Sequence, residues 1–262
     1  MSLDKPITIF DGRGNPYAAP GNGAQLYAAP QDTAQRKDVP WLDADVSRRC
    51  SRIKHRRLLS AARLIVSQFP DVDAAAEQKS DYVSSGGWLP IFAGKDEAWG
   101  REATEVLHSA LRILDVRGPL FSFAKDMKLA SRLLDIDGEV FVVHLRSESG
   151  FPQIQVLEAH RIGCRNGETL VAAGPYKGLP ILNGIVYNLV GRPVAYRFLA
   201  DDPSQDRDLS ALDVTRIAHA RWYSDGRPVG AVASGILDWC DIKQYRDFEK
   251  IAQAVNAALA VI

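Results

Sequence analysis

Residues 131–162, SRLLDIDGEVFVVHLRSESGFPQIQVLEAHRI, contain the pattern that decides the fold. The first residues close a helix whose apolar side chains share one face, and the helix is expected to begin at Pro119. Asp137 and Gly138 interrupt it, because Asp and Gly favour turns. The next stretch, Val140–Leu145, is β-branched and aromatic and predicts a buried strand. We therefore expect a helix on a sheet, with a second strand near the end of this stretch.

The composition sets broad limits on the protein class. The chain has 262 residues, 46% of them hydrophobic, which suits one large or two small domains. Lysine and arginine number 32, as do aspartate and glutamate, so bulk charge favours no class of partner. The cysteines at 50, 164 and 240 form no CxxC pair, which argues against disulfides or zinc and favours a reducing compartment. No apolar run approaches the roughly 18 residues of a membrane span, so no membrane association is expected.

The helix expected over residues 43–69 is strongly basic. Between residues 48 and 63 it has seven lysines and arginines and no acid. Arg52, Arg56 and Arg57 are its candidates for contact with nucleic acid or an acidic partner. An ordinary solvated face, on which long basic side chains cover apolar neighbours, also accounts for the run.

The remaining elements follow from periodicity and turn residues. We expect helices over 71–82 and 96–114, hairpin strands over 182–190 and 194–200, a polar loop over 201–210, a strand over 214–222 and a helix from about 231 to the end. In this last helix an apolar residue stands at every third position from Ile236 to Ile251. Since three residues turn roughly 300° around an α-helix, the row drifts around the helix and indicates more than one neighbour.

Candidate catalytic residues are few. Glu158 and His160 are two apart on an expected strand, so they share a face and could form a general-base pair. A polar pair at a strand end also explains them, because no nucleophile or third partner stands at a telling position. HExxH, GxSxG and kinase motifs are absent. The sequence therefore predicts no catalytic, metal-binding or cofactor-binding residues and no cofactor, with a cryptic enzyme using Glu158 and His160 as one alternative.

Four blocks, in order, resemble the lambda-like portal proteins of tailed bacteriophages. They are SRLLDIDGEVFVVHL (131–145), IQVLEAHRI (154–162), LNGIVYNLVGRPVAYRF (182–198), and His219 followed by GRPVGAVASGILDWCDIKQYRDFE (226–249). The resemblance covers roughly residues 43–262. It implies a structural subunit and not an enzyme.

The resemblance also implies a place in the virus particle. The subunit would belong to a homo-oligomeric ring, a dodecamer in the full-length family, that forms the channel for double-stranded DNA at one capsid vertex. The ring would serve genome packaging, genome ejection and head–tail connection. The implied partners are DNA, the terminase, and capsid and tail-connector proteins, with no membrane. The implied location is the virion, and the host cytoplasm during assembly.

The predicted fold class is α+β, with N-terminal helices packed on a mainly antiparallel sheet and a long helix at the end. We expect a disordered polar arm over 1–42, a portal-like α/β (wing-type) domain over 43–228, and a stem-like helix over 229–262. The length usual in the family implies that this helix is truncated. Its Lys243, Arg246 and Lys250 are candidates for an edge that faces DNA or a neighbouring subunit, unless they are an ordinary solvated face. A small nucleic-acid adaptor that uses the basic helix 48–63 is a further alternative.

Overall fold

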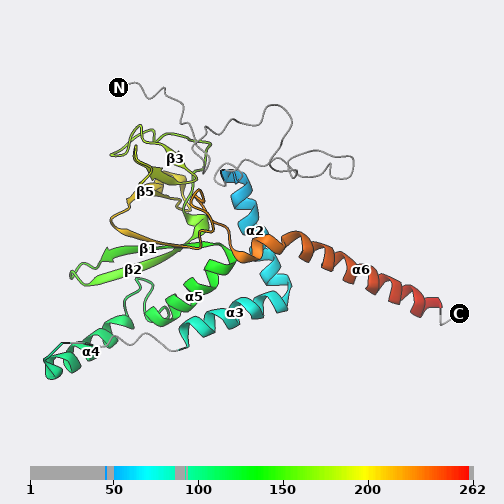
Figure 1. The fold of residues 1–262 in the computed structure, drawn as a ribbon, viewed down its shortest axis with the longest axis horizontal. Coiled ribbons are helices and arrows are strands. Elements are labelled where there is room, and N and C mark those ends of the chain that lie inside the picture. Colours follow the sequence, from blue (N-terminus) through cyan, green and yellow to red (C-terminus); the bar gives the residue numbers. More distant parts are fainter. Residues whose placement is uncertain (1–44, 46–49, 86–91, 93, 260–262) are drawn as a thin grey trace, which may run out of the picture. The chain divides into compact units, whose positions relative to one another are not determined.

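The computed structural model describes residues 45, 50–85, 92 and 94–259 (Figure 1). Its helices are α2 (Arg52–Gln68), α3 (Pro70–Ser84), α4 (Glu97–Leu111), α5 (Phe123–Ile136) and α6 (Ile236–Leu259). Its strands are β1 (Glu139–Arg146), β2 (Pro152–Glu158), β3 (Ile181–Leu182), β4 (Ile185–Tyr187), β5 (Pro193–Phe198), β6 (Arg207–Ser210) and β7 (Val214–Ala218). The fold is α+β and ends in a long helix, as predicted.

Two antiparallel sheets meet in one apolar core. The first has the order β2-β1-β7, and the second has the order β3-β4-β5-β6. On β1, Phe141 is fully buried and its ring lies 5.3 Å from that of Tyr196 on β5. Helix α5 contacts β1 and β2. Because β1 is enclosed by neighbours on both faces, its sequence is a continuous apolar run instead of an alternating one.

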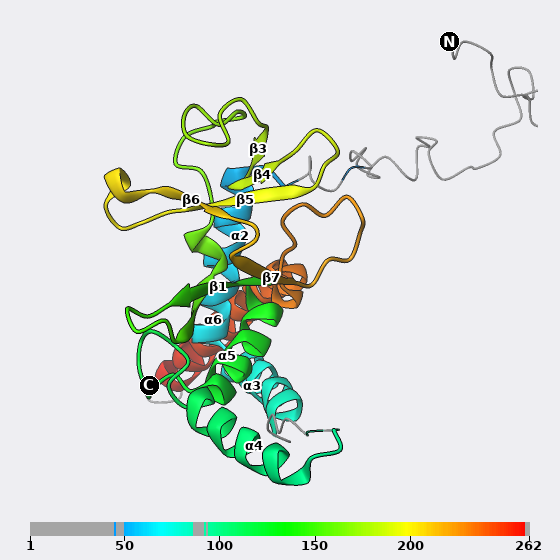
Figure 2. The same cartoon turned by 90° about the vertical axis from the view of Figure 1, so that its left-hand side faces the viewer.

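Helices α2, α3 and α5 form a layer beside the first sheet (Figure 2). Apolar side chains of α2, such as Ile65 and Val66, share a buried cluster with Ile136 of α5. Ion pairs join α5 to α3, including Lys128 with Asp81 at 2.6 Å. The layer therefore combines an apolar contact on one side with charged contacts on the other.

Some predicted boundaries are wrong for local reasons. Ser51 is extended (ψ 161°) and its side chain caps α2, so that helix begins at Arg52 and not at 43. Helix α5 begins at Phe123 instead of Pro119, because Gly118 has a positive φ of 90° and opens a turn first. The last helix opens with a 3₁₀ turn, Ala231–Gly235, before α6. The predictions for residues 1–42 and for Arg48 and Arg49 lie outside the described residues.

Strand β6 lies within the segment expected to be a polar loop. Its residues are mostly polar, so the apolar alternation that marks a strand is absent. It pairs with β5 instead through its backbone and through Arg197, whose Nε donates to Asp208 Oδ1 at 2.8 Å. Cross-strand charge pairing of this kind supports a strand that has little apolar pattern.

Candidate functional site

Buried charge gathers at the turn between α5 and β1. The side chain of Glu139 is fully buried, yet its carboxylate accepts a hydrogen bond from Arg216 Nε at 2.9 Å and another from Arg227 Nε. Just before it, Asp137 accepts from Arg63 Nε of α2 at 2.9 Å. Buried carboxylates need partners of this kind, because an isolated buried charge is very costly.

Arg227 anchors the loop that leads from β7 towards α6. Only 3% of its side chain is exposed. Besides Glu139, its guanidinium donates to three backbone carbonyls: those of Ala159 at 2.9 Å, Ile162 at 3.0 Å and Asn183. Ala159 directly follows β2 of the first sheet, and Asn183 lies in the turn between β3 and β4 of the second. The side chain of Arg227 therefore joins both sheets to this loop.

Two glycines bring backbone against backbone at the same place. Gly138 has a φ of 91°, and a Cβ there would lie 2.5 Å from the carbonyl carbon of Val229. A Cβ on Gly230 would lie 2.3 Å from carbonyl oxygens at the end of α5. His55 of α2 is also buried here and hydrogen-bonds the backbone at Pro228; burial first, then the charge of Arg227, lower its pKa to about 3. We call the set formed by Asp137–Glu139, Arg227–Gly230, His55, Arg63 and Arg216 the junction.

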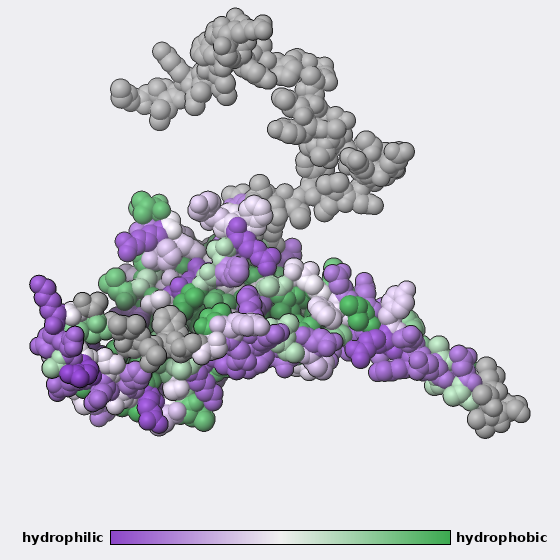
Figure 3. Space-filling view, turned by 60° about the horizontal axis from the view of Figure 1, so that its bottom comes forward, coloured by the Kyte–Doolittle hydropathy of each residue, from purple (hydrophilic) through white to green (hydrophobic). Residues whose placement is uncertain are grey.

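Helix α6 extends from the junction and contains Lys243, Arg246 and Lys250, the three candidates for a basic edge. The ring of Trp239 packs 5.2 Å from that of Phe69, and Lys243 Nζ donates to Gln68 Oε1 at 3.1 Å. Lys243, Arg246 and Lys250 line one hollow of about 300 Å³ beside the end of α2, together with the acidic Asp247, so the structure brings the three basic residues together. Figure 3 shows hydrophilic and hydrophobic residues mixed along α6. The large apolar side chains that are exposed on residues 236–257 of this helix are Leu237, Ile242, Tyr245, Phe248, Ile251 and Val255.

The three candidate arginines on α2 lie in different surroundings. Arg52 Nη1 donates to the backbone carbonyls of Cys164 at 3.0 Å and Arg165 at 2.8 Å, so its guanidinium holds α2 against the rest of the domain. Arg56 and Arg57 are exposed and line a shallow hollow of about 500 Å³ on the outer face of α2. Arg52 lines the same hollow but is half-buried, whereas the side chains of Arg56 and Arg57 are exposed.

Glu158 and His160 meet, although not on a common strand. Strand β2 ends at Glu158, and His160 lies in the 3₁₀ turn Ala159–Arg161, so the predicted strand geometry is wrong. His160 Nδ1 is nevertheless 3.2 Å from Glu158 Oε2. The hydrogen bond with His160, and then the charge of Arg63, lower the pKa of Glu158 to about 2. A carboxylate with so low a pKa is a weak base near neutral pH, where general bases work best with a pKa near the operating pH.

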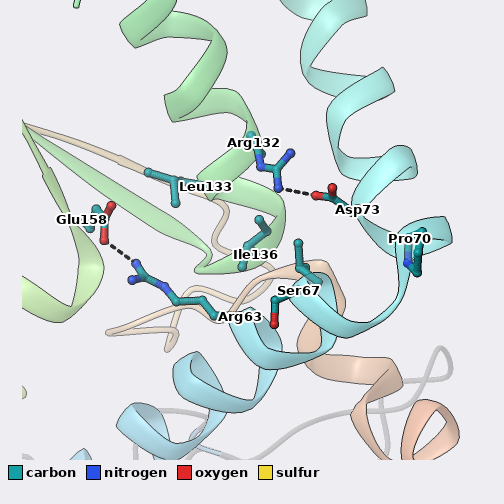
Figure 4. A pocket seen from close by; sticks show the side chains of 9 residues that line it. Arg63, Ser67, Pro70, Asp73, Arg132, Leu133, Ile136 and Glu158 are labelled. Atoms are coloured by element: carbon teal, nitrogen blue, oxygen red, sulfur yellow. Dashed lines mark hydrogen bonds and ion pairs between the residues drawn. The ribbon is translucent and has the colours of Figure 1, made fainter. Parts of the chain in front are cut away.

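Glu158 also borders a pocket of about 470 Å³ between α2, α3 and α5 (Figure 4). Arg63 Nη2 reaches Glu158 at 2.8 Å on one side, while Arg132 pairs with Asp73 on the other. Leu133 and Ile136 lie between these pairs. Both arginines are already paired with carboxylates, so the pocket offers an anion little uncompensated charge.

A second buried acidic pair lies at the start of α5. Arg117 Nη2 lies 2.6 Å from Asp115 Oδ2 and 3.0 Å from Asp126 Oδ1. Burial, and then the negative charge of Asp115, raise the pKa of Asp126 to about 7. The structure thus shares one arginine between two carboxyl groups that were not singled out in the sequence.

Neither metal ligands nor membrane spans stand out in the described part of the chain. Its His, Cys, Asp and Glu side chains form no group of three or more that could hold a metal ion. No helix within 50–85 or 94–259 has the length and apolar character needed to cross a membrane. The three cysteines are not disulfide-bonded.

The sequence did not predict the roles of Glu139 and Arg227. One local signal exists for each. Glu139 is a charged residue directly before Val140–Leu145, which was expected to be a buried strand, and Arg227 stands in the last of the four blocks that resemble portal proteins. A charged residue next to a segment expected to be buried suggests a buried partner, but it does not say which one.

The chain matches one family of known proteins over most of its length. Residues 57–262 match the family model described as phage portal protein, lambda family. No curated protein matches the chain. Among solved structures, a chain described as "Virion of native gene transfer agent (GTA) particle" is similar with a TM-score of 0.49 and 11% identity. The match covers 75% of this chain and 45% of that one, so this chain spans less than half the length of that similar chain.

Proposed function

Because the chain belongs to the lambda family of phage portal proteins, we propose that it is a subunit of a homo-oligomeric ring that forms a channel for double-stranded DNA. Its role is structural, in the assembly of a phage particle. In the proposed ring, residues 43–228 are the wing-type domain and 229–262 contribute the stem-like helix. The family match over residues 57–262 is the observation that carries this proposal.

The surface of α6 supports assembly into a ring. Its exposed residues include Tyr245 and Phe248, of which 79% and 68% are accessible in the single chain. A contiguous row of large apolar side chains on one helix is typical of a protein interface. In a ring, neighbouring subunits would cover this row, and the ring would sit at a capsid vertex with the terminase, capsid and tail-connector proteins as partners. We place it in the virion, and in the host cytoplasm during assembly.

The charges of α6 suit a channel through which DNA slides. The helix has three basic residues, Lys243, Arg246 and Lys250, and four acidic ones at 238, 241, 247 and 249, so its net charge is 3 − 4 = −1. A strongly basic helix would bind phosphates tightly, because each phosphate contact releases counterions. We propose that the three basic residues, grouped in one hollow, face DNA or the neighbouring subunit without gripping the duplex.

Light scattering coupled to size-exclusion chromatography tests the ring. Over a rising concentration series, we expect the purified chain to form one discrete oligomer, and negative-stain images should show a ring with an open centre. A chain that stays monomeric at every concentration would overturn assembly by this chain. Replacing Tyr245 and Phe248 with serine should weaken the oligomer, whereas Leu212→Ser, on a loop residue that is 87% exposed, provides the control.

A further inference from the structure

The segment that joins α4 to α5 is held to the first sheet by its backbone. The N–H of Val116 donates to Ile154 O of β2 at 3.0 Å, and the N–H of Ile154 donates to Leu114 O at 2.9 Å. Asp115, between the two partners of Ile154, forms a parallel bridge with it. We call residues 112–118 the strap. Within the described residues α4 packs extensively against no other helix or strand, so the strap is its main attachment to the sheets.

A buried pair of carboxyl groups ties the strap to α5. Asp115 on the strap and Asp126 on α5 are each only 1% exposed. Arg117 lies between them, and its guanidinium also covers the ring of Phe121, 3.9 Å from the centroid. Arg117 donates three hydrogen bonds to Asp115, from its backbone N–H, Nε and Nη2, and one to Asp126, from Nη2. One cation therefore serves two carboxyl groups, and it serves Asp115 better.

The charges of this pair balance only if one carboxyl group keeps a proton. Asp126 Oδ2 is buried and has no hydrogen-bond partner among the described residues. The two carboxyl groups are close enough to hydrogen-bond each other, and such a bond needs a proton on one of them. With both groups ionised, one arginine would face two negative charges in the interior, where an uncompensated charge is very costly. The proton belongs to Asp126, because Asp115 receives most of the hydrogen bonds from Arg117.

We propose that Asp115 and Asp126 form a proton-operated latch, which holds the strap against β2 and α5 while Asp126 carries its proton and loosens when that proton is lost. The latch is a property of the single chain and does not depend on the proposed ring. It acts on the segment through which α4 is attached. The strap would therefore be a pH-sensitive element in a domain that has no catalytic role.

Other charged groups act on the latch from α5 and from β2. They are Lys125 of α5, which lies near Asp126, and Glu158 at the end of β2, which faces Arg117. Glu158 has a pKa of about 2, so it stays ionised between pH 5 and pH 9. Within this range Asp126 is therefore the member of the latch whose charge changes.

The pH range of the latch follows from the two states of Asp126. In the closed latch, burial and then the charge of Asp115 raise its pKa to about 7, and on opening the pKa returns to its ordinary value of 3.8. The open state therefore binds fewer protons between these two values. Each rise of one pH unit in this range increases the open fraction by up to about tenfold. Above about pH 7 both states are ionised, and the increase stops.

Hydrogen exchange of the full chain, followed by mass spectrometry, measures this opening. The readouts are the amides of Val116 and Ile154, whose protection factors are corrected for the intrinsic exchange rate at each pH. We expect these protection factors to fall by about tenfold or more from pH 5 to pH 7, and to change less than about twofold from pH 8 to pH 9. At every pH the strap should also be less protected than β1, because the latch opens without unfolding of the sheet.

Two variants assign the effect to the carboxyl pair, and a third is the control. Asp126→Asn keeps the shape of the protonated side chain but cannot titrate, so the protection of the strap should be equal at pH 5 and pH 7. Asp115→Asn leaves Arg117 to Asp126 alone and should remove most of the pH dependence. The control, Asp201→Asn, changes an exposed carboxyl group that also pairs with an arginine, and should respond to pH like the wild type.

Three outcomes would overturn the latch. The first is protection of the strap that does not change between pH 5 and pH 7 in the wild type. The second is a pH response that persists in Asp126→Asn; if circular dichroism shows that this variant does not fold, a response that persists in Asp115→Asn decides instead. The third is a strap as well protected as β1 at every pH, because the strap would then open only when the whole domain unfolds.

Discussion

Replacing Arg227 with methionine removes the guanidinium that holds the junction together and keeps much of the side-chain volume. Glu139, whose side chain is fully buried, would then be left with Arg216 alone. The three backbone carbonyls that Arg227 serves, in the segment from β2 to β4, would lose a donor in the protein interior. Two kinds of damage therefore follow from one substitution.

The size of the effect follows from these contacts. Removing one partner of a buried ion pair costs about 3–5 kcal/mol. A buried carbonyl left without a donor costs roughly 1–3 kcal/mol, but such losses within one network do not add simply. We therefore take about 3 kcal/mol as the lower bound for Arg227→Met. A folded domain has a total stability of about 5–15 kcal/mol, so the loss is a large share of it.

Thermal unfolding followed by circular dichroism, at equal protein concentrations, measures this loss. For a domain of this size, about 3 kcal/mol corresponds to a fall in Tm of roughly 6–12 °C. Arg161→Met is the control, because Arg161 pairs at 2.6 Å with Asp201, whose side chain is 92% exposed. Exposed pairs contribute about 0–1 kcal/mol. If Arg227→Met lowers Tm no more than Arg161→Met does, the proposed contribution of Arg227 to the stability of the fold is refuted.

Three further substitutions test local parts of the structure. Gly230→Ala should lower the free energy of unfolding, measured in urea, by about 1–3 kcal/mol, because the new Cβ would meet backbone oxygens. The control is Gly167→Ala, where a Cβ has open space around it and the free energy of unfolding should change by less than about 1 kcal/mol. Asp126 has a pKa raised from 3.8 to about 7, so its contribution to stability is complete below pH 3.8 and is lost as pH rises through 7. Asp126→Asn should remove this dependence, and a Tm difference from the wild type that is equal at pH 5 and pH 8 would contradict it. His55 has a pKa lowered from 6.5 to about 3, so its contribution to stability is present above pH 6.5 and declines as pH falls towards 3. His55→Gln should therefore make the fall of Tm between pH 7 and pH 4 shallower. An unchanged slope would show that His55 does not cause this fall.

The elements that the sequence predicts well are those with a local physical cause. The end of α5 is one, because Asp137 and Gly138 favour a turn and the N–H of Asp137 donates to Leu133 O at 2.7 Å. The apolar run that became β1 is another, since its side chains are buried whichever neighbours enclose them. The turn between β3 and β4 also had a local signal, because Asn-Gly is a pair that favours tight hairpin turns. Asn183 and Gly184 both have positive φ in the structure. The strand predicted over 182–190 nevertheless ran through this turn.

Contacts between residues far apart in the sequence could not be predicted, for a different reason. Glu139 and Arg227 are 88 residues apart, and nothing in the spacing of one sequence couples them. The Glu158–His160 pair illustrates the same limit on a smaller scale. Its closeness was predicted from strand geometry that proved wrong, and the arginine that helps to lower the pKa of Glu158 comes from α2, nearly a hundred positions earlier. The sequence named the right neighbours but could not supply the third charge that makes Glu158 a weak base.

The three consecutive residues of the turn at 137–139 contact different segments of the chain. Asp137 pairs with Arg63 of α2, Gly138 touches the backbone of the loop before α6, and Glu139 binds arginines of β7 and of that loop. Beyond Trp239, by contrast, α6 has no buried side chain within its described residues. The start of α6 is therefore held by the polar and backbone contacts of the junction and by the apolar contacts of Ile236 and Trp239 with the cluster between α2 and α5. In a ring, a small change in this turn would move the whole of α6 in every copy, so we expect substitutions in the junction to alter assembly as well as stability.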